Sequence, residues 1–238
     1  MSFVTPAVLP SSRKELEEKL ALFEYVPAIS RVQIDVVDGK FASPASWPYT
    51  ASEELRTMVA SGDMLPNLHR VEYEIDLMCL DAREAAEMWL ALGASRLTFH
   101  AESVTNLRQL ITFARTRLGC DPSSCGVVTF GLALNIESDL ALIEPYFDQI
   151  DYVQFMGIAR IGRQGQPFDR RVLEKIRVFH MRYPKIPLQI DGGVSLDTAK
   201  ELLVAGVSQL VIGSALLRSG DLASEVAKFD ALQSPYGV

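Results

Sequence analysis

The stretch that decides the fold is RVQIDVV, residues 31–37. Its β-branched and apolar composition is typical of a strand, and residues two apart in a strand project from the same face. The three even-numbered residues are all apolar and share one face, whereas the other face carries Arg31, Gln33 and Asp35. This strand therefore has to pack one face against apolar partners and meet polar groups with the other.

Three later strands repeat this division. Their polar faces carry Glu72, Glu74 and Asp76 in residues 71–78, Arg96, Thr98 and His100 in residues 95–100, and Gln189 and Asp191 in residues 187–191. Buried charges need partners, so we expect the two arginines of these four faces to neutralise the two glutamates. That pairing leaves an amide, an imidazole and three carboxylates at the C-terminal ends of the strands: Gln33, His100, Asp35, Asp76 and Asp191.

Strand-like and helix-like segments alternate eight times along the chain. We expect strands at 3–9, 31–37, 71–78, 95–100, 126–134, 150–156, 187–191 and 208–212. We expect helices at 11–25, 51–61, 81–93, 103–118, 138–147, 169–183, 195–205 and 214–230. The alternation predicts one α/β domain over residues 1–238, a closed (βα)8 TIM barrel, with a doubly wound sheet as the alternative. Barrel enzymes place their chemistry at the C-terminal ends of the strands.

Composition limits the partners and cofactors. The 238 residues carry a net charge of −7, which argues against a nucleic-acid partner, and no apolar run reaches the roughly 18 residues of a membrane span. Three cysteines are too few for a disulfide framework, and three cysteines with three histidines argue against a Cys/His zinc site. Free cysteines without a secretory leader predict a cytoplasmic protein.

Six short motifs follow one another over nearly the whole chain. They are QIDVVDGKF (33–41), DLM (76–78), TFHAE (98–102), GLALN (131–135), DGGV (191–194) and GSA (213–215). Together, and in this order, they resemble motifs of the ribulose-phosphate 3-epimerase family. The resemblance implies a barrel of the ribulose-phosphate-binding type and an isomerase of carbohydrate metabolism that acts on a pentose phosphate.

The resemblance also implies a reaction and its acid/base pair. Members of the family invert the carbon next to the carbonyl of a phosphorylated ketose through an ene-diolate. Asp35 and Asp191 match the two aspartates that exchange the proton on opposite faces of the substrate. Two groups are needed because the proton leaves one face and returns on the other. A homo-oligomer is expected on the same resemblance.

The chain departs from the family pattern at the metal site. The family holds a divalent metal with two histidines and the two aspartates, but Gln33 and Asp76 stand at the histidine positions. Gln33, Asp35, Asp76 and Asp191 would form an all-oxygen set, which suits Mg²⁺ or Mn²⁺ better than Zn²⁺. Alternatively, a basic side chain such as Lys40 compensates the acidic cluster and the reaction is altered or lost. No organic cofactor is expected.

Two glycine-containing turns predict the phosphate site. Gly192 and Gly193 follow one strand, Gly213 and Ser214 follow the next, and backbone N–H groups at such turns can bind phosphate. In the loop at 157–168, Gly162 and Gly165 allow close backbone approach, and Arg160 and Arg163 are candidates for an anionic group. Met78 and Met156 end two strands beside the expected substrate. At the first strand, Ala7 stands where the family has a substrate-contacting serine.

Three functions are therefore open. The first is an epimerase acting on a phosphorylated ketose, with Asp35 and Asp191 as the acid/base pair. The second is a barrel that binds a phosphorylated ligand but has lost the epimerase chemistry. The third is a lyase or synthase on the same barrel. The barrel alone does not choose among them.

Overall fold

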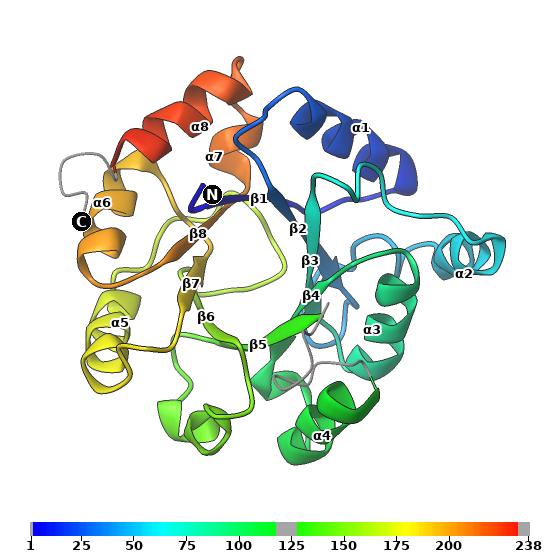
Figure 1. The fold of residues 1–238 in the computed structure, drawn as a ribbon. Helices are drawn as coiled ribbons and strands as arrows, with labels where there is room; N and C mark the ends of the chain where they lie inside the picture. Colours follow the sequence, from blue (N-terminus) through cyan, green and yellow to red (C-terminus); the bar gives the residue numbers. More distant parts are fainter. Residues whose placement is uncertain (1, 118–127, 233–238) are drawn as a thin grey trace.

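The computed structural model describes residues 2–117 and 128–232, and its eight parallel strands close into a barrel in chain order (Figure 1). The strands are β1 (Val4–Val8), β2 (Arg31–Val37), β3 (Glu72–Met78), β4 (Arg96–His100), β5 (Thr129–Leu134), β6 (Tyr152–Met156), β7 (Leu188–Asp191) and β8 (Gln209–Ile212). This confirms the closed barrel over the doubly wound sheet. None of the helices in the described part is long and apolar enough to cross a membrane.

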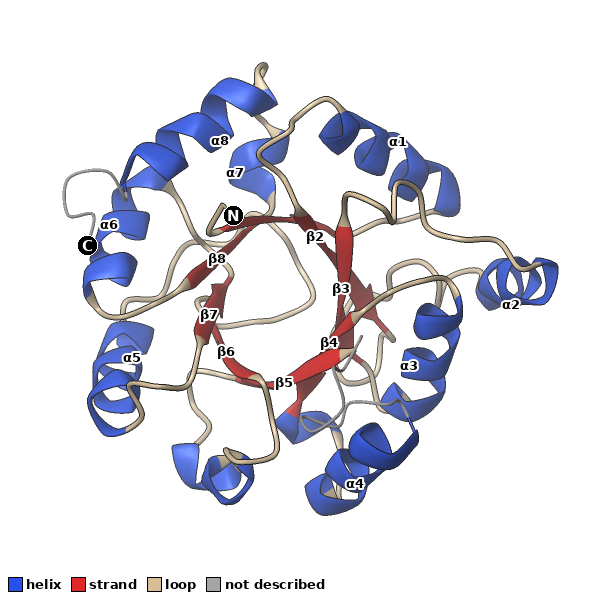
Figure 2. Ribbon diagram, viewed as in Figure 1, coloured by secondary structure: helices blue, strands red, loops and turns tan. Residues whose placement is uncertain are grey.

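Helices surround the barrel and cover the apolar outer faces of the strands (Figure 2). They are α1 (Arg13–Glu24), α2 (Ser52–Ser61), α3 (Ala82–Ala91), α4 (Leu107–Arg117), α5 (Arg171–Arg182), α6 (Leu196–Val204), α7 (Ser214–Leu217) and α8 (Leu222–Asp230). The expected end of the helix at residue 118 and the expected start of the strand at residue 126 lie outside the described residues. Two of the three cysteines, Cys120 and Cys125, also lie outside them, and the third, Cys79, is buried and forms no disulfide.

Three expected helices are wrong in extent. Residues 138–147 form two 3-10 turns, η2 (Leu140–Leu142) and η3 (Glu144–Tyr146), because Pro145 has no N–H with which to continue an α-helix. Residues 214–230 divide into α7 and α8, since the Asp221 side chain caps a new helix by accepting from the Ser224 amide. Helix α4 begins only at Leu107, after the 3-10 turn η1 (Ala101–Ser103).

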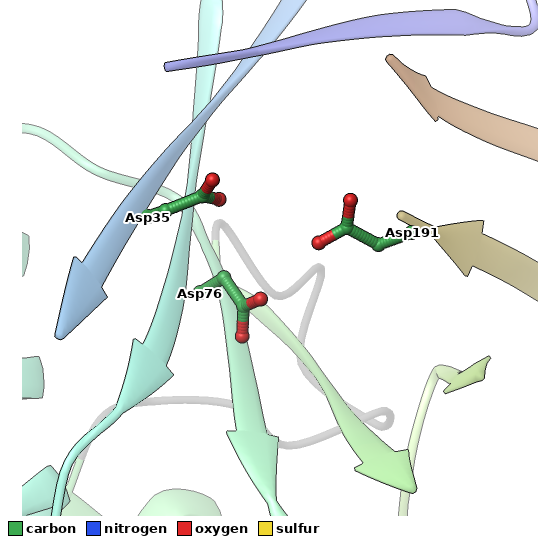
Figure 3. Close-up of side chains that lie close together, drawn as sticks. All are labelled: Asp35, Asp76 and Asp191. Atoms are coloured by element: carbon green, nitrogen blue, oxygen red, sulfur yellow. The ribbon is translucent and has the colours of Figure 1, made fainter. Parts of the chain in front are cut away.

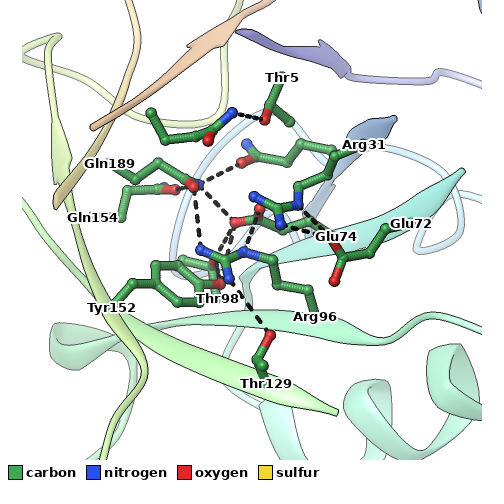
Figure 4. A network of polar contacts seen from close by, with 12 residues as sticks. Thr5, Arg31, Glu72, Glu74, Arg96, Thr98, Thr129, Tyr152, Gln154 and Gln189 are labelled. Atoms are coloured by element: carbon green, nitrogen blue, oxygen red, sulfur yellow. Dashed lines mark hydrogen bonds and ion pairs between the residues drawn. The ribbon is translucent and has the colours of Figure 1, made fainter. Parts of the chain in front are cut away.

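A polar network fills the base of the barrel, as the strand parity predicts (Figure 4). The buried Glu74 accepts from Arg96 Nε at 2.9 Å and from Thr98 Oγ1 and Gln189 Nε2 at 2.7 Å each. The Arg96 guanidinium also stacks 3.3 Å over the ring of Tyr152. Arg31 pairs with Glu72 at 2.6 Å, so the two arginines neutralise both glutamates, as expected, and the carboxylates above them are left facing one another.

Removing the Arg96 charge should destabilise the protein far more than removing the charge of Arg31. Arg96→Met strands the fully buried Glu74 carboxylate, at a cost of about 3–5 kcal/mol of unfolding free energy. The matched control Arg31→Met breaks a pair whose side chains are 22% and 35% exposed, for which about 0–1 kcal/mol is expected. Urea denaturation measures both, and equal losses would contradict this account of the core.

Candidate active site

Three aspartates meet at the C-terminal ends of β2, β3 and β7 (Figure 3). Asp35 and Asp76 are register partners on adjacent strands, and Asp191 faces them from across the barrel. One oxygen from each carboxylate lies within 4.8 Å of the others, and all three side chains are buried. The structure thus brings together the three carboxylates that the sequence predicts to be neighbours.

Neutral amides and one imidazole support the three carboxylates. Gln33 Nε2 donates to Asp35 at 2.8 Å and to Asp191 at 3.1 Å. Asp76 is hydrogen-bonded by His100 Nε2 at 3.0 Å and by a side-chain amide of β6, Gln154, at 3.2 Å. None of the lysines and arginines in the described ranges forms an ion pair with these aspartates. The negative charge of the cluster is therefore balanced at most by His100.

Burial and mutual repulsion set the protonation of the cluster. Burial, and next the charge of Asp76, raise the pKa of Asp35 to about 8. Burial and the charge of Asp35 raise the pKa of Asp191 well above its ordinary value. Burial disfavours the charged form of His100, but the charge of Asp76 outweighs it and raises the pKa of the imidazole. Protons must therefore remain on the cluster near neutral pH unless a cation replaces them.

The donor chemistry of the three aspartates fits a hard divalent cation. Carboxylate oxygens are the ligands that Mg²⁺ and Mn²⁺ prefer, and a buried anionic cluster without lysine or arginine gains most from a positive ion. Gln33 presents its amide nitrogen, not its oxygen, to the carboxylates, and its oxygen accepts from Gln189 Nε2 at 3.3 Å. In this orientation Gln33 positions the carboxylates instead of completing the ligand set. Lys40 lies exposed in the loop after β2 and forms no ion pair with the cluster.

A cavity of about 140 Å³ opens above the carboxylates. Asp35 and Asp191 line it, whereas Asp76 and Gln33 lie deeper. Nearly all the sequence-predicted substrate residues also line it, namely Gly192, Gly193, Gly213, Ser214, Gly162, Gly165, Met78, Met156 and Arg163. Arg160 is exposed and does not line the cavity, so the expectation of an anion site at that residue finds no support in this geometry.

Glycine is required where the loops close round the cavity. A Cβ on Gly193, which has φ of +69°, would lie 2.6 Å from the backbone of Phe168 at the end of the β6–α5 loop. A Cβ on Gly162, at φ +86°, would lie 3.1 Å from Ala42 of the β2–α2 loop. The Arg163 side chain ties the same two loops together by donating to the Ser43 carbonyl at 3.2 Å. The β6–α5 loop therefore covers one side of the cavity.

Sequence reasoning missed several lining residues, among them Gln164 and Arg218. Gln164 lies between two glycines of the β6–α5 loop, and Arg218 follows Ser214 by four residues, which is about one helical turn. The neighbouring glycines and the helical spacing are the signals that could have indicated them.

The fold and the site define a class, a (βα)8 barrel with an acidic centre and a glycine-lined pocket at the C-terminal ends of its strands. The particular family follows from comparison with known sequences. The model of the ribulose-phosphate 3 epimerase family matches residues 3–217, and the chain belongs to that family.

Individual relatives are distant. Ribulose-phosphate 3-epimerase 2 of Cupriavidus necator is 26% identical over 226 residues, covering 92% of this chain and 85% of that protein. Ribulose-phosphate 3-epimerase of Bacillus subtilis is 29% identical over 195 residues, which cover 80% of this chain and 81% of that protein. Among solved structures, 3-hexulose-6-phosphate synthase from Salmonella typhimurium superposes with a TM-score of 0.64 and is 16% identical in sequence. KGPDC from Streptococcus mutans, in complex with a phosphorylated sugar, superposes with a TM-score of 0.68 and is 14% identical. Each pair covers 98% of both chains, so the likeness shows a shared barrel fold.

The raised pKa of Asp35 predicts how the metal-free protein responds to pH. Its value rises from 3.8 to about 8, so the folded protein binds this proton more tightly than the unfolded chain. The resulting stability is present below pH 3.8 and is lost as pH rises towards 8, with a slope of at most about 1.4 kcal/mol per unit per proton. Urea denaturation of chelator-treated protein between pH 5 and 8 measures this loss. Asp35→Asn should flatten the profile, and an unchanged slope would contradict the assignment.

Proposed function

We propose that the protein is an epimerase acting on a phosphorylated ketose, by proton transfer between two aspartates through an ene-diolate. One observation carries the proposal: Asp35 and Asp191 enter a single cavity from β2 and β7, and both are held at raised pKa values. Carboxyls of this kind exchange protons with carbon near neutral pH, where ordinary aspartates are too weakly basic.

The two aspartates act as one titrating pair. Burial raises the pKa of both carboxyls, the charge of Asp76 adds to this rise at Asp35, and the charge of Asp35 adds to it at Asp191. The reaction uses the state in which one carboxyl of the pair is protonated and its partner is ionised. The ionised member removes the proton next to the ketose carbonyl, and the protonated member returns one to the opposite face. Gln33 donates to both and holds them at a fixed separation for this exchange. His100 and Gln154 hold Asp76 beneath them.

A divalent cation held by Asp35, Asp76 and Asp191 would stabilise the negative charge that develops on the ene-diolate oxygens. Mg²⁺ or Mn²⁺ is proposed over Zn²⁺ because the donors are oxygens. Gln33 could join this set only if its amide turned over, since its nitrogen now faces the carboxylates. No organic cofactor is invoked.

The substrate is proposed to be a small phosphorylated sugar whose phosphate lies against Gly192, Gly193, Gly213 and Ser214. These residues line the cavity beside Asp191, so a short carbon chain can reach from the phosphate to the carboxylates. Met78 and Met156 provide apolar walls. The sugar-phosphate complex of the Streptococcus mutans barrel supports a ligand of this class. The cytoplasmic location and the homo-oligomer remain predictions.

A barrel that binds phosphorylated ligands without epimerising them is the second candidate. The observation that favours it is the replacement of both family histidines, because Asp76 adds a negative charge where the family has a neutral imidazole. A lyase or synthase on the same barrel stays a third alternative.

Deuterium exchange separates these functions. Incubating the protein with D-ribulose 5-phosphate in D₂O should place deuterium at C3, measured by NMR, faster with Mg²⁺ or Mn²⁺ than with Zn²⁺. Asp35→Asn and Asp191→Asn should each slow the exchange by about 10²- to 10⁴-fold, because each removes one acid/base group. No exchange with any of the three metals, or exchange that survives Asp191→Asn, would refute the epimerase.

A further inference from the structure

Several residues of the β6–α5 loop line the cavity, and the Gln164 side chain is the one that hydrogen-bonds the barrel strand β1. Gln164 is half-buried, and its Nε2 donates to the carbonyl oxygen of Ala7 in β1 at 3.2 Å. Gln164 lines the same cavity as Asp35 and Asp191, and its amide partly offsets the rise in the pKa of Asp35. Gln164 therefore extends from the loop into the cavity that holds the acid/base pair.

The Gln164 amide also lies close to Gly213, one of the residues proposed to bind phosphate. A Cβ on Gly213 would lie 2.7 Å from Gln164 Nε2 and 3.1 Å from its Cδ. A side chain at Gly213 would thus displace Gln164. The amide therefore lies near the proposed phosphate end of the cavity that Asp35 and Asp191 also line.

Apart from the two arginines, Arg163 and Arg218, the remaining side chains of this part of the cavity offer few alternatives for a sugar hydroxyl. Leu9, Met78, Met156, Ile158 and Val211 are apolar. Gln166 donates to the backbone carbonyls of Arg160 and Arg163, and Ser195 caps α6, so both are engaged elsewhere. Ala7 offers only its backbone. A primary amide that gives one N–H to Ala7 keeps a second N–H and its oxygen for a ligand.

We propose that Gln164 is the positioning residue for the carbon chain of the substrate. Its amide hydrogen-bonds a hydroxyl or carbonyl oxygen between the phosphate and the reacting carbon, and so places that carbon at Asp35 and Asp191. This inference rests on the proposed function for its ligand class. Gln164 then distinguishes a phosphorylated sugar from phosphate alone, because only the sugar reaches it.

Calorimetric titration tests this with two ligands in the presence of Mg²⁺. D-ribitol 5-phosphate has the chain and phosphate of the substrate but no carbonyl, so it binds without reacting, and inorganic phosphate occupies the phosphate end alone. Gln164→Met, which keeps the volume and removes the amide, should weaken ribitol 5-phosphate binding by about 3- to 10-fold and leave phosphate binding unchanged. Gln109→Ala, at an exposed site on α4, is the control and should change neither.

The possible outcomes separate this role from the proposed reaction. The role of Gln164 would be overturned if Gln164→Met lost affinity equally for both ligands or for neither. It would also be overturned if the wild-type protein did not bind ribitol 5-phosphate. If Gln164→Met weakens only ribitol 5-phosphate binding but the protein shows no deuterium exchange, the role of Gln164 is supported and the epimerase function is rejected. If the protein shows deuterium exchange but Gln164→Met binds both ligands as tightly as the wild type, the epimerase function is supported and the role of Gln164 is rejected. Unchanged thermal unfolding of Gln164→Met shows that the loss is local.

Discussion

The structure depends on one electrostatic constraint: three buried carboxylates within 4.8 Å of one another cannot all be ionised without a compensating positive charge. Their surroundings supply hydrogen bonds from Gln33, Gln154 and His100 but no lysine or arginine among the residues described. The cluster must therefore hold protons or bind a cation. Both states suit proton transfer at carbon, the first by keeping acids near neutral pH and the second by stabilising an anionic intermediate.

The rest of the barrel keeps this constraint in place. Below the cluster, Glu74 accepts from Arg96, Thr98 and Gln189, so the positive charge of Arg96 is paired with Glu74 and not with the aspartates. Above it, the β6–α5 loop packs on the β2–α2 loop through Gly162 and closes one side of the cavity. The acidic centre thus opens towards the pocket in which the proposed substrate lies.

Strand periodicity explains how much could be predicted. The two-residue repeat of a strand identifies the inward-facing residues, so the sequence predicted that the two arginines neutralise the two glutamates and that Asp35 and Asp191 meet at one rim. Which arginine pairs with which glutamate came only from the structure. Loops have no such period. The inward direction of Gln164 and the outward direction of Arg160 depend on tertiary contacts and could not be read from the chain. The orientation of the Gln33 amide is likewise set by its neighbours on β2 and β7.

Proton release on metal binding tests the central claim most directly. Asp35, with its pKa of about 8, is mostly protonated at pH 7, so a cation bound by the three aspartates must displace a proton. Calorimetric titration of Mn²⁺ into metal-free protein, in two buffers of different ionisation enthalpy, counts the protons released. We expect one Mn²⁺ to bind per chain with release of about one proton, and we expect Asp76→Asn to lose both the binding and the proton release. Absence of saturable binding, or binding without proton release, would contradict the central claim.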